Sequence, residues 1–154
     1  MRRTLLFSSI VCLGCGLYAV YSCRSSSSNQ SAAEKIPDSI SYSFNIRPIL
    51  SDKCFKCHGP DANKRQAGLR LDVPEGAYAA FKDNPQSHAL VPGSLERSAL
   101  YQRVCTEDTA ALMPPPSSNL KRLNASEIAL IKKWIKQGAK YEKHWAFIPP
   151  KSYP

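Results

Sequence analysis

Several features of common small proteins are missing from this chain of 154 residues. Apart from Cys12 and Cys15 in the N-terminal leader pattern, no second Cys/His pair stands at metal-ligand spacing; the rest offers only scattered Cys105, His88 and His144, so a four-ligand zinc site is not favoured. No βαβ pattern accompanies the cysteines, which argues against a thioredoxin-like pair. No alternating pattern marks a strand, and no apolar run reaches the about 20 residues of a membrane-spanning helix. What remains is the pattern of a small helical protein.

The most informative segment is Cys54-Phe55-Lys56-Cys57-His58, a C-x-x-C-H run. In an exported protein this run is typical of a c-type haem attachment site. Two thiols add across the two vinyl groups of one porphyrin, and an imidazole reaches the iron from the same side. On a helix, Cys54, Cys57 and His58 would share one face. The run therefore predicts one covalent haem c with His58 as proximal ligand. A zinc half-site, a redox-active pair and a structural disulfide are the alternatives.

The N-terminus has the pattern of an export signal. A short basic start is followed by an apolar segment, residues 5–19, which serines and glycines interrupt. Val20-Tyr21-Ser22-Cys23 then resembles a bacterial lipobox, although Tyr21 is unusual there. We expect residues 1–23 to be a signal peptide, with Cys23 lipidated on the periplasmic or cell-envelope side of a membrane. Ordinary cleavage and an uncleaved anchor stay open. The serine-rich residues 24–42 are predicted to be a flexible tether.

The remaining cysteines and the charge add two expectations. Cys12 and Cys15 lie in the leader before Cys23, and Cys105 ends an apolar-periodic segment, which predicts a small buried residue. Because the leader contains two arginines and no acidic residue, its removal lowers the formal charge from +9 to +7. An exported haem protein does not meet nucleic acid, so this charge favours an acidic redox partner or a solvated surface. Roughly 110 residues make one small domain.

Apolar periodicity predicts an all-α domain with three main helices and long loops. The first begins at Ser43 or Asn45 and runs through the C-x-x-C-H run. The second begins at Ser94 and continues to Val104. The third is capped by Asn124, with Glu127 completing a capping box, and Gly138 ends it. Residues 59–93 are expected to be loops, with a short helix near residues 74–81.

Met113 is the predicted sixth ligand of the iron. Three prolines follow it, and they restrict the loop to few conformations. A thioether is a soft ligand opposite histidine, and His/Met ligation raises the reduction potential. His88 and His144 are the alternatives that would give bis-histidine ligation. An iron with an open sixth position is the third possibility.

These motifs together resemble a small class I cytochrome c and, more narrowly, the planctomycete-type cytochrome c module. The matching segments are residues 44–50, 54–62, 68–72, 91–94, 113–116 and 134–139. The resemblance implies a class I cytochrome c-like fold over residues 43–142, one covalent haem, His58 and Met113 as axial ligands, and electron transfer. In that family the module often heads a longer protein. Residues 143–154 are accordingly expected to be a linker into a further C-terminal region.

Two function classes follow from this interpretation. The first is an electron-transfer module, which works with a redox partner protein or with fused C-terminal domains as the haem head of a larger oxidoreductase. The second is a haem catalyst or ligand sensor, which needs an open sixth position. The module by itself is expected to transfer electrons, and its membership of a larger redox enzyme stays open. Met113 discriminates between the classes, because a bound thioether blocks access to the iron.

Overall fold

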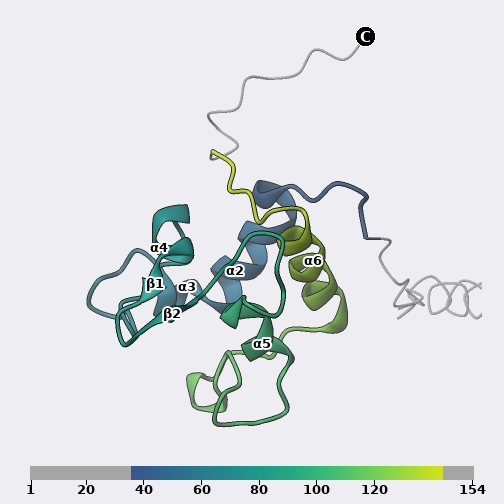
Figure 1. Ribbon diagram of the computed structural model, residues 1–154. Helices are drawn as coiled ribbons and strands as arrows, with labels where there is room; N and C mark the ends of the chain where they lie inside the picture. Colours follow the sequence, from purple (N-terminus) through teal and green to yellow (C-terminus); the bar gives the residue numbers. More distant parts are fainter. Residues whose placement is uncertain (1–35, 144–154) are drawn as a thin grey trace, which may run out of the picture. The chain divides into compact units, whose positions relative to one another are not determined.

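The computed structural model describes residues 36–143, drawn in colour in Figure 1. The chain divides into two units, Met1–Ala32 and Ala33–Pro154, and the described residues belong to the second. The predicted signal peptide, Cys23 and His144 lie outside them. No helix within residues 36–143 has the length and hydropathy needed to cross a membrane. The elements are the π-helical turn η1 (Tyr42–Ile46), α2 (Arg47–Lys53), α3 (Phe55–His58), α4 (Pro74–Tyr78), β1 (Ala80–Phe81), β2 (Asn84–His88), α5 (Ala99–Cys105), the 3-10 turn η2 (Pro116–Ser118) and α6 (Ala125–Lys136).

The first predicted helix is present but is interrupted at Cys54. Its N-cap is Ser41 rather than Ser43 or Asn45, and the Ser41 hydroxyl accepts a hydrogen bond from Phe44 N. Pro48 lies in the first turn of α2, which follows η1 without a break. Cys54 then leaves helical geometry, with φ −126° and ψ −39°, and α3 begins at the next residue. The C-x-x-C-H run therefore starts at a break between two helices.

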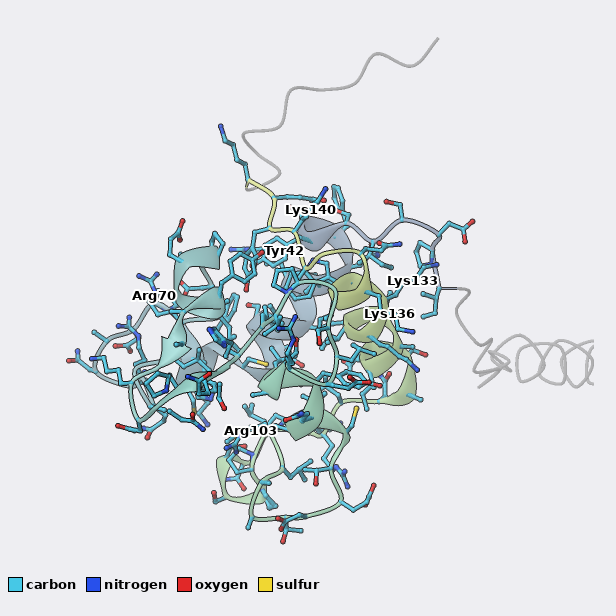
Figure 2. The ribbon with its side chains drawn as sticks, in the orientation of Figure 1. Tyr42, Arg70, Arg103, Lys133, Lys136 and Lys140 are labelled. Atoms are coloured by element: carbon cyan, nitrogen blue, oxygen red, sulfur yellow. The ribbon has the colours of Figure 1, made fainter. Side chains whose placement is uncertain are left out.

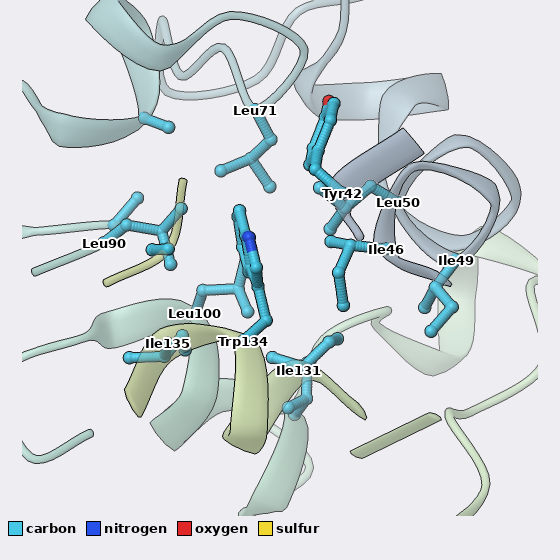
Figure 3. Packing of buried hydrophobic residues seen from close by; sticks show 14 of the residues in the cluster. Tyr42, Ile46, Ile49, Leu50, Leu71, Leu90, Leu100, Ile131, Trp134 and Ile135 are labelled. Carbon is cyan, nitrogen blue, oxygen red and sulfur yellow. The ribbon is translucent and has the colours of Figure 1, made fainter. Parts of the chain in front are cut away.

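The last helix, α6, matches its prediction closely. Asn124 Oδ1 accepts from Glu127 N at 2.9 Å, and Glu127 Oε2 accepts from Asn124 N at 2.7 Å, which completes the capping box. Ile131, Trp134 and Ile135 form its buried side, which packs toward α5 and η1. Figure 3 shows Trp134 at the centre of the core, surrounded by Tyr42, Ile46, Leu50, Leu71, Leu90 and Leu100.

The second predicted helix, α5, begins after Ser98 instead of Ser94. Ser98 is fully buried, and its hydroxyl does not cap the helix. The oxygen accepts from Val91 N at 2.9 Å and donates to Ser94 O at 2.6 Å. This serine therefore fixes the preceding loop against the start of α5.

A small antiparallel sheet lies in the segment that was expected to be loop. β1 pairs with β2, with Ala80 opposite His88 and an irregularity between Ala80 and Phe81. Most of β2 is exposed, so its sequence has no alternation of apolar and polar residues. Its Pro85 is compatible with a short edge strand but argues against a strand when the sequence is considered alone.

The predicted fold class is therefore wrong. Residues 36–143 contain five α-helices, three of them with seven residues or more, together with the two-stranded sheet and the turns η1 and η2. This is not the three-helix, all-α, class I cytochrome c-like fold that periodicity and resemblance implied. The short elements depend on contacts between separate segments, such as the 3.0 Å hydrogen bond from Leu90 N to Ala77 O. Hydrophobic periodicity does not encode such contacts.

The two ends of the described segment lie side by side. Glu142 Oε2 accepts from Ser41 Oγ at 2.7 Å and from Ser43 N at 3.0 Å. Ile40 and Tyr42, which end the predicted tether, are buried in the core. The packed part of the chain consequently begins before Ser43.

Candidate functional site

One cavity gathers the residues that the sequence motifs pointed to. Its volume is about 490 Å³, which lies within the range of about 300–1,000 Å³ typical of small-molecule sites. Cys54, Cys57, His58 and Met113 all line it. Apolar side chains make most of the remaining wall: Ala67, Leu69, Leu71, Phe81, Ala89, Ala99, Leu100, Val104, Pro114, Pro115 and Leu120. The fold thus brings the four predicted cofactor-binding residues to one largely apolar cavity.

Backbone hydrogen bonds hold the C-x-x-C-H run in place. His58 N donates to Cys54 O at 2.8 Å, which closes the turn that contains both cysteines. Gln66 N donates to Cys57 O at 2.8 Å, and Leu71 N donates to His58 O at 2.8 Å. These last two bonds satisfy carbonyl groups at the end of α3, which have no partner within the helix. The loop after the run therefore folds back onto it.

Gly59 permits the close approach of this loop to α3. A Cβ atom at this position would stand 2.4 Å from Phe55 O and 2.9 Å from Phe55 Cβ. Atoms this close would force the backbone apart. The residue after the run must therefore be glycine for α3 to end in this geometry.

The imidazole of His58 is suited to bind a metal. Its Nδ1 is buried and has no hydrogen-bond partner among the described residues. Burial lowers the pKa of His58; the nearby backbone of Gln66 opposes this, and the positive charge of Arg103 adds to it. The neutral ring is the form that binds metal ions. A buried polar atom without a partner costs free energy, so this ring fits a site that a bound group completes.

The two thiols of the run also fit covalent attachment of a porphyrin. Both are free, and burial raises the pKa of the Cys54 thiol to about 12. Across residues 36–143, no three Cys, His, Asp or Glu side chains are grouped to hold a metal ion. The zinc half-site therefore has no additional protein ligands in this part of the chain. An apolar cavity with two thiols and one imidazole on its wall suits haem better.

Met113 reaches the cavity from a loop that is held on both sides. Its backbone N donates to Arg103 O at 3.0 Å, which joins the loop to α5. Leu112 and Pro114 on either side are buried, and Met113 itself is half-buried on the cavity wall. The Met113–Pro114 peptide bond is cis. The fold thus places the one methionine of the described residues at the cavity.

The two alternative histidines have different positions. His88 ends β2, and the residues on either side of it, Ser87 and Ala89, line the cavity, whereas His88 does not. Successive side chains of a strand point to opposite faces, which explains this difference. His144 lies outside the described residues.

Cys105 is exposed, so the prediction that it is buried is wrong. The buried side of α5 is formed by Leu100 and Val104. One helical position rotates a side chain by about 100°. Cys105 therefore turns away from the core although it directly follows a buried residue.

Sequence reasoning missed the polar part of the cavity wall. These residues are Lys53, Lys82, Asp83, Asn84, Ser87, Gln102, Arg103 and Ser118. Several come from the β1–β2 hairpin, which has no strand pattern to reveal it. A signal existed for Arg103, because it is placed three residues after Leu100, and residues three apart lie on the same side of a helix.

A comparison with protein families agrees with the motif analysis over part of the chain. The model of the family described as Planctomycete cytochrome C matches residues 54–117. The chaperone protein DnaJ of Campylobacter lari is 34% identical over 61 residues, which is 39% of this chain and 16% of the chaperone. The chain thus spans a small fraction of that relative's length. No solved structure matches the chain. The resemblance indicated by the motifs is confirmed: residues 54–117 match the planctomycete cytochrome C family, which supports a c-type haem electron-transfer module.

Proposed function

We propose that the folded domain, expected from the sequence over residues 43–142 and extended by the core residues Ile40 and Tyr42, is an electron-transfer module carrying one haem c, with thioether bonds to Cys54 and Cys57. The observation that carries this proposal is a largely apolar cavity whose wall includes both cysteines, His58 and Met113. Bound haem would supply a one-electron couple between ferric and ferrous iron. The chain would hold the macrocycle by two covalent bonds and exclude water from it with the aliphatic side chains of the wall.

His58 and Met113 are the proposed axial ligands. His58 is supported by its buried, unpartnered ring nitrogen and by a lowered pKa that keeps the ring neutral. Met113 is supported by its place on the same cavity wall, from which His88 is absent. Histidine and methionine ligation together raise the reduction potential. Burial of the iron in an apolar cavity acts in the same direction, because it disfavours the more highly charged ferric form.

The setting of the module is proposed from the sequence. The leader pattern supports export to the periplasmic or cell-envelope side, and the lipobox-like segment supports a lipid on Cys23 that anchors the protein to a membrane. The partner would then be a redox protein or fused C-terminal domains on that side, which would make the module the haem head of a larger oxidoreductase.

Covalent attachment gives the decisive test of this function. The full chain is expressed together with a periplasmic haem-attachment system and then denatured in acid and organic solvent. Thioether-bound haem stays with the protein under these conditions, so we expect the colour to remain with the polypeptide. The double variant Cys54→Ala/Cys57→Ala should lose it, whereas Cys105→Ala, which removes an exposed thiol away from the cavity, should keep it. Haem that extracts freely from the wild type would refute the proposal.

A further inference from the structure

The polar residues of the cavity wall include three cations, namely Lys53, Lys82 and Arg103. Haem c combines an apolar macrocycle with two propionate carboxylates. A matching site therefore needs an apolar slot together with a cation or hydrogen-bond donors for the carboxylates. The three cations are the candidates for this second requirement.

Local carboxylates distinguish Lys53 from the other two cations. Lys53 Nζ lies 2.6 Å from Asp52 Oδ2 and is therefore already paired. Lys82 is exposed and lies beside Asp83 in the turn between β1 and β2. No carboxylate of residues 36–143 lies within ion-pair distance of Arg103. Lys82 likewise forms no ion pair, so Lys82 and Arg103 are the two cations of the wall without one among the described residues. Of these two, Arg103 is the one that bonds the loop that carries Met113.

The guanidinium of Arg103 also has N–H donors that make no hydrogen bond within the described residues. Its Nη1 donates to Ala111 O at 3.3 Å, a long hydrogen bond that uses one of the five N–H groups of an arginine. The remaining donors suit the planar, two-oxygen geometry of a carboxylate. Figure 2 shows Arg103 on α5, next to the loop that leads from this helix. At this place the side chain can meet a carboxylate at the edge of the cavity without being taken out of water.

Arg103 contacts the Met113 loop at two points. Its backbone oxygen accepts from Met113 N at 3.0 Å, and its side chain bonds Ala111 O two residues earlier. A ligand held by the guanidinium would therefore be linked to the loop that carries Met113.

We propose that Arg103 binds a propionate carboxylate of the haem and is a positioning residue for the Met113 loop. This inference rests on the proposed haem c module. A positive charge beside the site disfavours the more positive ferric iron, so Arg103 raises the reduction potential. The bond between Arg103 and the propionate would also add to the hydrogen bonds that hold Met113 at the cavity wall.

The experiment compares Arg103→Gln and Arg103→Lys with Arg97→Gln in the full chain carrying haem. Arg97 is exposed, precedes α5 and does not line the cavity, so Arg97→Gln makes the same charge change elsewhere. At the wild-type midpoint potential, we expect Arg103→Gln to lower the ferrous-to-ferric ratio about three- to tenfold, which is about 30–60 mV for one electron. Arg97→Gln should change the ratio less than twofold. Arg103→Lys should recover most of the ratio, because it restores the charge.

Infrared difference spectra between the oxidised and reduced forms supply the second readout. Loss of the bidentate contact should shift the propionate carboxylate bands in both Arg103 variants and leave them unchanged in Arg97→Gln. If Arg103→Gln does not retain haem, the bands of Arg103→Lys decide the question. Attached haem with the same potential and the same bands in the Arg103 variants as in the control would overturn this inference alone. Failure of the wild type to retain haem would instead refute the module itself.

Discussion

The backbone N–H of Met113 donates a hydrogen bond to the carbonyl oxygen of Arg103 at 3.0 Å. This bond ties the proline-rich loop to α5, whose Leu100 and Val104 line the cavity. Leu112 and Pro114, on either side of Met113, are buried and anchor the loop in the protein interior. The thioether is therefore presented to the cavity by a loop that needs little further ordering when a ligand binds.

Replacement of Met113 tests the proposed sixth ligand. Met113→Ala and Met113→Leu both remove the sulfur, and Met113→Leu nearly conserves the side-chain volume, which separates loss of the ligand from loss of packing. We expect both variants to have a lower potential and to bind carbon monoxide or peroxide. Met113→His should stay six-coordinate with a lowered potential. Optical spectra and redox titration of the haem-containing protein provide the measurement.

Unchanged spectra and potential in both sulfur-free variants would contradict ligation by Met113. If a histidine were the sixth ligand instead of Met113, replacement of His144 would identify it. Electron transfer would then still be the proposed function. An iron already open to carbon monoxide in the wild type would instead favour the alternative of a haem catalyst or ligand sensor.

Replacement of Cys23 tests the lipid anchor. A fatty-acid analogue added to growing cells should label the wild-type chain and should not label Cys23→Ala. Cys105→Ala is the matched control, because it removes an exposed cysteine from the folded part and should leave labelling intact. Equal labelling of the wild type and Cys23→Ala would rule out lipidation at this residue.

Ser98→Ala tests the hydroxyl that joins the preceding loop to α5. The substitution leaves the N–H of Val91 without its 2.9 Å acceptor at a fully buried position. The free energy of unfolding should fall by about 1–3 kcal/mol, the cost of an unsatisfied buried donor. Ser117→Ala, at an exposed position in η2, should change it by less than about 0.5 kcal/mol. Urea unfolding at neutral pH measures both, and equal midpoints would contradict the role of this bond.

Glu142→Gln tests the contact between the two ends of the described segment through the pH dependence of stability. Burial raises the pKa of Glu142, but hydrogen bonds from Ser41 and Ser43 outweigh it and lower the pKa below 4.5. A lowered folded-state pKa adds stability above the unfolded value, and this stability is lost as pH falls through the folded value. Glu142→Gln should therefore destabilise the protein more at pH 7 than at pH 3.

The expected size of this effect is below about 1 kcal/mol, because Glu142 is exposed and solvent screens its charge. Urea unfolding of the variant and the wild type at both pH values gives the comparison. Glu96→Gln, which changes an exposed carboxylate before α5, serves as the control. A Glu142→Gln deficit that is equally large at pH 3 would show that the charge is not responsible.

The elements that the sequence predicted well are those whose signals are local. The capping box of Asn124 and Glu127 and the apolar spacing of Ile131, Trp134 and Ile135 are complete within one helix, so α6 was predicted almost to its ends. The predicted start of α5 is wrong because serine is a common N-cap residue, which made Ser94 a good candidate. The helix instead begins after Ser98, whose hydroxyl is hydrogen-bonded to the loop before the helix. Both serines fit the local pattern, and contacts from outside the helix decide between them.

The sequence alone determined the proposed chemistry of attachment, because the spacing of Cys54, Cys57 and His58 within one run specifies which groups can reach a single ligand. Only the tertiary structure decided what surrounds that run. It placed Met113 on the same wall, turned His88 away from it, exposed Cys105 and brought the β1–β2 hairpin and Arg103 to the edge of the cavity. These outcomes depend on hydrogen bonds and packing between segments far apart along the chain. Local spacing carries no information about such contacts, so they appear only once the chain is folded.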